Sequence, residues 1–253
     1  MGFSIIWVEF DWDTDIYLAR QIVSEKLATV IDKLPQNIGQ PTLGPQSSIL
    51  GELLIVGLTA DSTSMLDLRT IAEWVIRPRL LSTGGVAQVS VLGGDIKEYQ
   101  ILLHPERMMH YGVTLSEVME TTREMNTNTQ GGVIYEYGNE YIVRGTVSTQ
   151  DVNELARSVI KKTGDTPITL EDIADVRIGA SQPKLGLASE KGKPAVLLTV
   201  TKQPNTGTLE LTEKLENAIN DLKKNLPTDI KVSTDIFRQA HFIESSINNV
   251  KDS

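Results

Sequence analysis

The sequence predicts an α+β fold, because three of its segments combine apolar strands with a long amphipathic helix. One strand–helix pattern ends at Leu34-Pro35, and a closely similar pattern ends at Leu226-Pro227. A strand–helix–strand pattern lies between them, at about 52–92. Together with the pattern at about 195–236, it forms the two βαβ halves of a split, ferredoxin-like sandwich. The repetition indicates a duplicated module that carries a large insertion.

The first copy of the repeated pattern predicts a strand at residues 3–10 and a helix that begins near Asp15 and extends toward Leu34. Asp11, Asp13 and Asp15 alternate as the oxygen ligands of a calcium loop do, but the glycine and the distal glutamate of such a loop are absent. We therefore interpret these carboxylates as caps that complement the helix dipole. The helix carries an apolar stripe made of Ile16, Ala19, Val23, Leu27, Val30 and Leu34.

The middle pattern predicts a buried strand at 53–58, a helix, and a returning strand at 86–92. Residues 61–63 (Asp-Ser-Thr) offer caps for the helix, and Pro78 is expected to end or kink it. The apolar residues of this helix are Met65, Leu68, Ala72, Val75 and Ile76.

The second copy predicts a strand at 195–200, a helix from about Thr208 to Leu226, and a last strand that begins at Ile230. The apolar stripe of its helix consists of Leu211, Leu215, Ala218, Ile219, Leu222 and Leu226. A further helix is expected to begin around His241, to which no catalytic role is assigned.

The insertion between the two halves, at about 95–190, contains the elements of a small α+β domain. We predict a strand at 99–103, a helix at 116–126 and a strand at 176–178. Two further apolar runs flank Gly138-Asn139, which predicts a β-hairpin turn. The tyrosines of this hairpin are available for contact with a partner, although ordinary cross-strand pairing would also explain them: Tyr135, Tyr137 and Tyr141.

The composition excludes several classes of protein. The net charge is −9 and the basic residues are dispersed, which argues against binding of nucleic acid. The absence of cysteine excludes disulfides, thiolate metal sites and cysteine nucleophiles. No apolar run of about 18 residues occurs, so no segment of the chain is expected to span a bilayer.

The best candidates for metal ligands are two histidines and two methionines, a set that would suit a soft ion such as Cu(I). They are His104, Met108, Met109 and His110. Arg107 within the set would repel a cation, and Pro105 is expected to start a short helix from which Met109 and Tyr111 pack inward. We therefore expect no metal site and keep the four residues as weak candidates only.

No pattern in the sequence indicates catalysis or a cofactor. The glycine pairs at 84–85, 93–94 and 131–132 match neither a dinucleotide-binding fingerprint nor a P-loop, and we interpret them as turns. No set of nucleophile, base and acid can be assembled from the sequence. We expect no enzymatic activity.

Several short segments occur in a characteristic order. They are Gly85-Val86-Ala87-Gln88-Val89, Gly93-Gly94, Tyr99-Gln100-Ile101, Pro105, Tyr111-Gly112-Val113-Thr114 and Asn126-Thr127-Asn128. This ordered set resembles the resistance–nodulation–division (RND) family of efflux transporters, and the run from Gly131 to Gly145 resembles its heavy-metal (cation) branch. The segments around Asp15 and Arg238 fit the same family, so the resemblance covers essentially the whole chain.

The resemblance implies that the chain is most of the first large periplasmic loop of a proton-driven pump in a Gram-negative inner membrane. Residues 1–38 would be a partial first porter subdomain, and residues 42–94 and 188–240 would be the two halves of the second. Residues 95–187 would be an inserted docking subdomain, and residues 241–253 would begin the connection to the second membrane helix.

The resemblance also implies partners. In the family, three protomers assemble into a homotrimer, docking hairpins interlock them, and a periplasmic adaptor and an outer-membrane channel join them. The residues of this chain that correspond to the docking hairpin are Tyr135, Tyr137, Gly138, Asn139 and Tyr141. The proton-relay carboxylates and the metal-binding methionines of the family lie outside the chain, so the resemblance transfers no metal site to it.

The chain departs from the family pattern in three respects. The first strand and helix of the first porter subdomain are missing, His104 replaces an expected aspartate, and Gly84 replaces an expected proline. Two alternatives remain open at this stage: the same region of a multidrug pump that exports amphiphiles, and a free-standing ferredoxin-like module that senses a small ligand or a metal ion.

Overall fold

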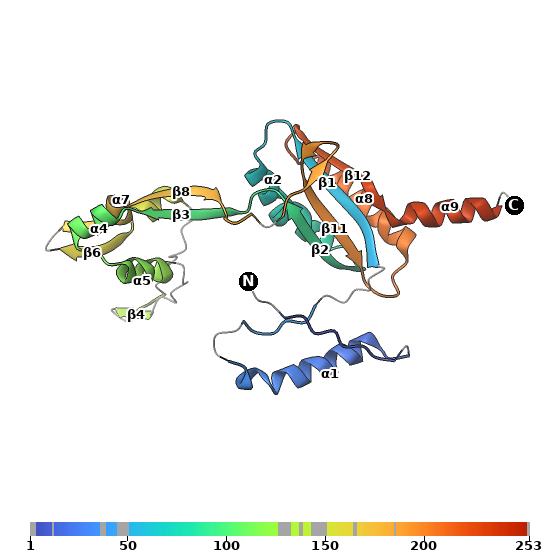
Figure 1. The fold of residues 1–253 in the computed structure, drawn as a ribbon, viewed down its shortest axis with the longest axis horizontal. Coiled ribbons are helices and arrows are strands. Elements are labelled where there is room, and N and C mark those ends of the chain that lie inside the picture. Colours follow the sequence, from blue (N-terminus) through green and yellow to red (C-terminus); the bar gives the residue numbers. More distant parts are fainter. Residues whose placement is uncertain are drawn as a thin grey trace. The chain divides into compact units, whose positions relative to one another are not determined.

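A computed structural model gives the structure of the chain. It describes residues 4–11, 13–35, 39–44, 51–125, 133–136, 139–142, 151–163, 166–184 and 186–251. The chain divides into two compact units (Figure 1). Unit 1 comprises residues 1–63, 71–92 and 188–253, and unit 2 comprises residues 64–70 and 93–187.

The centre of unit 1 is a four-stranded sheet that combines both predicted βαβ halves. Its strands are β1 (Glu52–Ala60), β2 (Val86–Gly93), β11 (Val196–Lys202) and β12 (Ile230–Arg238). Their order is β12-β1-β11-β2, and β1 runs antiparallel to both of its neighbours (Figure 1). Each half therefore contributes one inner and one edge strand, which is the interleaving of a split βαβ sandwich. The predicted α+β, ferredoxin-like fold class is confirmed.

Helix α8 (Thr208–Lys223) covers the sheet through its predicted apolar stripe. Leu211, Leu215, Ala218 and Ile219 are all buried. On the central strand, Leu54, Val56 and Leu58 are completely buried, and their alternation places them on one face of β1. Because α8 contacts β1, these two rows form the core of the sandwich.

The helical segment after β1 differs from the prediction in its cap. It consists of α2 (Met65–Ile71), a π-helical segment (Ala72–Ile76) and α3 (Arg77–Leu81). Of the two outcomes expected at Pro78, an end or a kink, the helix does not end there, and its π-helical irregularity lies directly before α3. The cap is Ser64, whose Oγ accepts a hydrogen bond from the Asp67 N–H at 3.1 Å, rather than residues 61–63.

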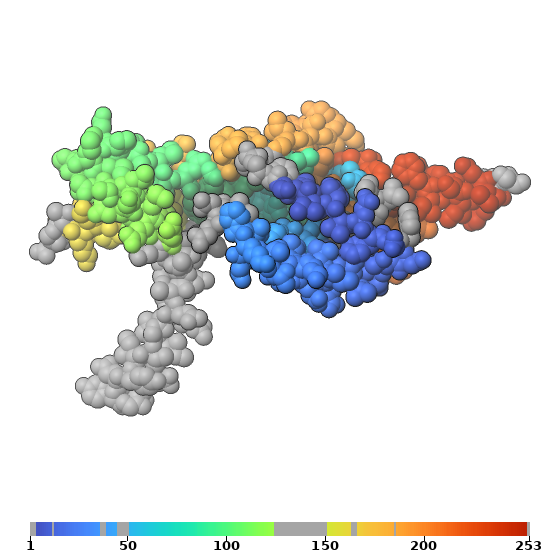
Figure 2. Space-filling model, turned by 60° about the horizontal axis from the view of Figure 1, so that its bottom comes forward, coloured from blue at the N-terminus to red at the C-terminus, as the bar shows by residue number. Residues whose placement is uncertain are grey.

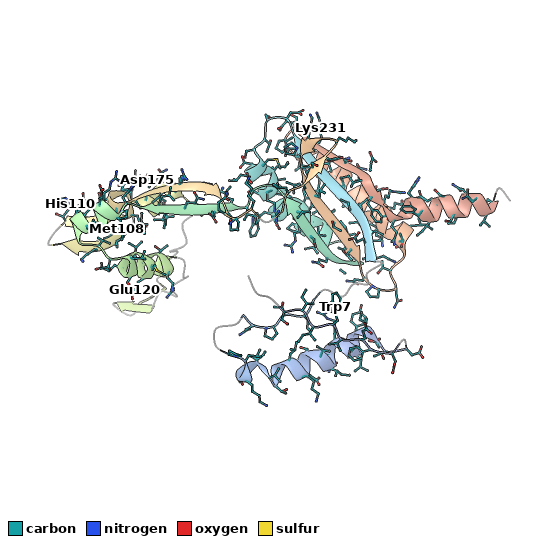
Figure 3. The ribbon with its side chains drawn as sticks, in the orientation of Figure 1. Trp7, Met108, His110, Glu120, Asp175 and Lys231 are labelled. Atoms are coloured by element: carbon teal, nitrogen blue, oxygen red, sulfur yellow. The ribbon has the colours of Figure 1, made fainter. Side chains whose placement is uncertain are left out.

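Residues 61–63 instead tie the end of β1 to the start of β12. The Asp229 carboxylate accepts hydrogen bonds from the N–H and the hydroxyl of both Ser62 and Thr63, at 2.7–3.1 Å. These bonds hold the pKa of Asp229 well below its usual range, and the bond from the Thr63 N–H has the largest effect. Asp61 pairs with Lys231 at 2.7 Å and with Lys193 at 3.1 Å (Figure 3 labels Lys231).

A short hairpin that was not predicted, β9 (Ser189–Glu190) and β10 (Lys193–Pro194), precedes β11. Its two-residue turn has positive φ at Lys191 and Gly192. The buried carboxylate of Glu190 lies against Gly57 of β1, where a Cβ would collide with that carboxylate and with Ile236 Cδ1. Gly57 is therefore required by this close approach.

The N-terminal segment contains α1 (Ile16–Ala28), followed by a 3₁₀ turn (Ile31–Lys33). The predicted cap is confirmed, because the Asp15 carboxylate accepts hydrogen bonds from the Tyr17 N–H at 2.7 Å and the Leu18 N–H at 3.0 Å. The helix ends at Ala28, earlier than predicted. Of its predicted apolar stripe, only Ala19 is buried.

The strand predicted at residues 3–10 is wrong. Residues 4–10 form no strand, although their apolar character is that of one. Ile6 is 82% exposed and Trp7 is 80% exposed (Figure 3 labels Trp7). A strand requires hydrogen-bonding neighbours, and no described segment pairs with these residues.

Unit 2 is built on a two-stranded ribbon, β3 (Lys97–Leu103) and β8 (Ala174–Ala180), which pair antiparallel along their whole length. Both strands were predicted. The other elements of the unit are α4 (Pro105–Tyr111), α5 (Leu115–Met125), β4 (Val133–Glu136), β5 (Asn139–Ile142), α6 (Val152–Ala156), β6 (Val159–Thr163), β7 (Thr166–Thr169) and α7 (Leu170–Ile173). Of these, α6, β6, β7 and α7 were not predicted.

Glycines make the predicted turns on either side of β2. Gly85, Gly93 and Gly94 all have positive φ, which non-glycine residues rarely adopt. The third pair, 131–132, lies outside the described residues.

The last helix is α9 (Gln239–Lys251), at the position where a helix was expected. Within the described part of the chain, no helix combines the length and the apolar character needed to cross a bilayer.

Candidate functional site

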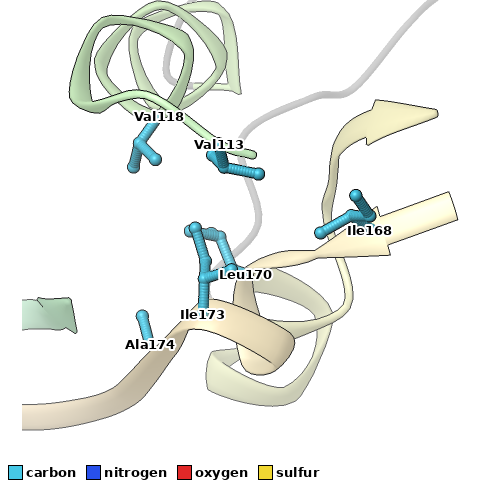
Figure 4. Packing of buried hydrophobic residues seen from close by; sticks show 6 residues of the cluster. All are labelled: Val113, Val118, Ile168, Leu170, Ile173 and Ala174. Atoms are coloured by element: carbon cyan, nitrogen blue, oxygen red, sulfur yellow. The ribbon is translucent and has the colours of Figure 1, made fainter. Parts of the chain in front are cut away.

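A small hydrophobic cluster forms the core of unit 2 around which the helices near the candidate ligands pack (Figure 4). Its buried members are Val113, Val118, Ile168, Leu170, Ile173 and Ala174. They come from the loop before α5, from α5, from β7, from α7 and from the first residue of β8. The cluster thus joins segments that are distant in the sequence, and α5, α7 and Met108 of α4 pack around it as a common base.

Short polar caps orient the helices of this base. In α7, the Thr169 N–H and hydroxyl both donate to Asp172 at 2.8 Å, a capping box that lowers the pKa of Asp172, chiefly through the N–H bond. In α5, Glu117 accepts from the Thr114 N–H at 2.7 Å and pairs with Lys161 of β6 at 3.0 Å. The bond from the Thr114 N–H is the largest of the effects that lower the pKa of Glu117 to about 2.

The short helix α4 carries three of the four candidate metal ligands, Met108, Met109 and His110, and the structure does not bring them together with His104. Met108 packs against the hydrophobic cluster, whereas Met109 is 76% exposed (Figure 3 shows Met108 and His110). The helix starts at Pro105 as expected, but the expected inward packing of Met109 and Tyr111 is wrong, because the helical phase turns Met108 inward instead. The ring of His110 meets Tyr111 edge-on, with centroids 5.0 Å apart.

His104 precedes α4 and faces β8 rather than the other candidates. The backbone N–H of His104 donates a hydrogen bond to the Ile173 carbonyl at 2.8 Å. Its Nε2 lies 3.0 Å from Asp175 Oδ2, a separation suited to an ion pair when the imidazole is protonated, but the two groups are not oriented for a directed hydrogen bond. In the described parts of the chain, no three His, Cys, Asp or Glu side chains are grouped so that they could hold a metal ion.

An open basin of about 450 Å³ lies between α4 and α7. It is lined by Glu106, Arg107, His110, Tyr111, Glu171 and Asp172. Three carboxylates and one guanidinium are among these residues, so acidic groups predominate in the lining. The Thr-x-x-Asp pattern at 169–172 is a helix-start signal that would have located α7, and with it Glu171 and Asp172, from the sequence.

The predicted hairpin is present as β4 and β5. The pairing runs from Val133 opposite Ile142 to Glu136 opposite Asn139. Asn139, which was predicted to lie in the turn, is instead the first residue of β5. Tyr137 and Gly138 lie outside the described residues. In the register of the two strands, Tyr135 is opposite Glu140 and Tyr141 is opposite Ile134.

Comparison with known proteins shows a family match over the whole chain: the family described as AcrB/AcrD/AcrF matches residues 1–253. The chain is 31% identical to Protein HelA of Legionella pneumophila over 99% of its length. It is 30% identical to the cobalt-zinc-cadmium resistance protein CzcA of Cupriavidus metallidurans over 99% of its length. It is 29% identical to the cation efflux system protein CusA of Escherichia coli K12 over 98% of its length.

Each of these matches covers 24% of the relative, so the chain spans about a quarter of the length of these curated proteins. Their names and the family match confirm the resemblance that the sequence indicated.

Proposed function

Because the chain belongs to the AcrB/AcrD/AcrF family, we propose that it is the periplasmic porter and docking portion of an RND pump that exports heavy-metal cations. One observation carries this proposal: two relatives that match the chain almost end to end are named as cation-efflux or metal-resistance proteins. The absence of a recognisable catalytic set in the sequence is compatible with transport as the role of the parent protein.

In this proposal the sheet and helices of unit 1, within 42–94 and 188–240, are the second porter subdomain, and residues 95–187 are the docking subdomain. Residues 1–38 are half of the first porter subdomain, and residues 241–253 lead toward a membrane helix. The exposed apolar residues at 4–10 support this division, because half of a sandwich would leave an apolar segment without strands to pair with. The parent protein is an inner-membrane protein of a Gram-negative cell, with this segment in the periplasm.

Two other functions give different expectations. A multidrug pump would share the fold but export amphiphiles. A free-standing sensor would need a pairing partner for every strand-like segment, and residues 4–10 have none among the described residues. The names of the relatives favour a metal-cation pump over both.

The test is expression of the full-length parent pump, with its adaptor and channel, in a Gram-negative host that lacks its own metal-efflux pumps. The expected result is a several-fold higher tolerated concentration of at least one of cobalt, zinc, cadmium, nickel, copper or silver. Tolerance to amphiphilic drugs should stay unchanged. Tolerance to amphiphiles alone would favour the multidrug alternative, and no gain in tolerance to any of these compounds would contradict the proposal.

We further propose that the β4–β5 hairpin joins the protomers of the pump, with Tyr135, Tyr137, Gly138, Asn139 and Tyr141 as contacts. Deletion of residues 136–140 from the full-length pump should shift it from trimer to monomer in native mass spectrometry, because the deletion removes the end of the hairpin. The control is Lys191→Gly at the turn of the β9–β10 hairpin, where the positive φ suits glycine. A deletion variant that remains as trimeric as this control would rule out the role.

A further inference from the structure

Helix α9 follows the sheet of unit 1 without an intervening loop, because β12 ends at Arg238 and α9 begins at Gln239. Arg238 lies opposite Leu54 in the sheet, next to the central strand. Its side chain is 28% exposed and therefore lies mostly within the protein. The residue at the junction of sheet and helix is thus well placed to control how the two are joined.

The guanidinium of Arg238 bonds to two helices at once. Its Nε donates to Glu216 Oε1 of α8 at 2.7 Å, and its Nη1 donates to Glu244 Oε2 of α9 at 2.9 Å. The planar fork of arginine suits two carboxylates in fixed directions, which a lysine could not hold in the same way. These bonds raise the pKa of Arg238, and the bond with Glu216 has the larger effect. Sheet, α8 and α9 are therefore tied at a single side chain.

Two further observations show that the first turn of α9 packs against the rest of unit 1. Thr208 Oγ1, at the start of α8, lies 3.4 Å from Gln239 Oε1. Ala240 is completely buried. Helix α9 contacts both α8 and β1.

Ile243 and Glu244 are partly buried, and α9 is exposed from residue 245 to its end. Val250 is 78% exposed. Figures 1 and 2 both show α9 extending away from the sheet, with the C-terminus at its far end. Among the described residues, α9 is therefore held to the rest of unit 1 at its N-terminal end.

We propose that Arg238 is the positioning residue that locks α9 to the sheet and to α8, so that the sheet and the helix move as one body. We call Arg238 with its bonds to Glu216 and Glu244 the clamp. A displacement at the far end of α9 is then transmitted to the sheet rather than absorbed by bending at residues 238–240. The transmission role rests on the proposed function, in which α9 leads toward a membrane helix. The existence of the clamp rests only on the contacts above.

Hydrogen exchange of the 253-residue chain tests the clamp. In Arg238→Met, amide exchange in the first two turns of α9 should become between about threefold and tenfold faster, because two partly exposed charged hydrogen bonds are lost. Glu244→Met, which removes the acceptor on α9 and keeps the bond of Arg238 to Glu216, should also speed exchange in α9, with less effect on α8. The matched control is Lys214→Met, which removes the exposed Lys214–Glu210 pair on α8. Equal exchange in Arg238→Met and the control would overturn the clamp.

A cross-link separates transmission from a purely structural role. The chain has no cysteine, so the pair Thr208→Cys and Gln239→Cys can be joined by a short bifunctional thiol reagent without side reactions within it. In a cysteine-free parent pump reconstituted in vesicles, Arg238→Met should slow cation transport several-fold, and the cross-link should restore it. Unchanged transport in Arg238→Met, or slow transport that the cross-link leaves slow, would overturn the transmission role.

The two proposals fail differently. If the unmodified pump moves no cation, the proposed function is wrong and the transmission role is lost with it. The exchange measurement on the 253-residue chain would still decide whether the clamp exists.

Discussion

The substitution Leu215→Ala is expected to lower the free energy of unfolding of unit 1 by about 2–5 kcal/mol. Leu215 is completely buried on α8, in the row that faces the sheet. Removing most of its side chain loses the transfer free energy of those atoms and leaves a cavity that a close-packed core fills only partly. The measurement is urea denaturation, in which a probe placed in the sheet monitors the unfolding.

The matched control is Leu209→Ala on the same helix. Leu209 is 41% exposed, and its loss should change the free energy of unfolding by no more than about 0.5 kcal/mol. The comparison keeps the residue type and the helix constant, so the difference reports burial alone. Equal effects of the two substitutions would mean that α8 does not face the sheet as described.

The substitution Leu170→Ala should have an effect of similar size, about 2–5 kcal/mol, but in unit 2. Leu170 is completely buried in the cluster of Figure 4 and is the first residue of α7. Because the cluster joins several short elements, the cavity should loosen all of them together. Hydrogen exchange should show faster exchange in β3, β8 and α5.

The amides of β1 and β11 should keep their protection in Leu170→Ala, because those strands belong to a different core. Leu115→Ala is the control in unit 2, since Leu115 is 55% exposed on α5. Loss of protection in β1 and β11 to the same extent would show that the two units unfold as one and would contradict their division.

The sequence predicted well those elements whose periodicity is long and unbroken. Helix α8 repeats apolar residues over four turns, and this pattern indicates a helix. Strand β1 is a run of mostly buried residues, and this pattern fits a buried strand. Short elements were missed. Strands β6 and β7 have only five and four residues, and α7 has four, so no periodic pattern can develop within them.

The candidate ligands show a different limit. The sequence placed two histidines and two methionines close together, but their directions depend on which face of α4 meets the cluster. That face is set by residues from α5, β7 and α7, far along the chain. Proximity in sequence therefore could not decide that Met108 turns inward and that His104 meets Asp175.

The family, the split βαβ pattern and the helix cap at Asp15 could be predicted from residue order alone, because each depends on local sequence. Whether an apolar segment becomes a strand depends instead on its tertiary contacts. Residues 4–10 and the strand β1 are both rich in apolar residues, but β1 has neighbours on both sides and residues 4–10 have no described neighbour. A strand is completed by hydrogen bonds to other segments, so the local sequence specifies its tendency and the partner specifies its existence.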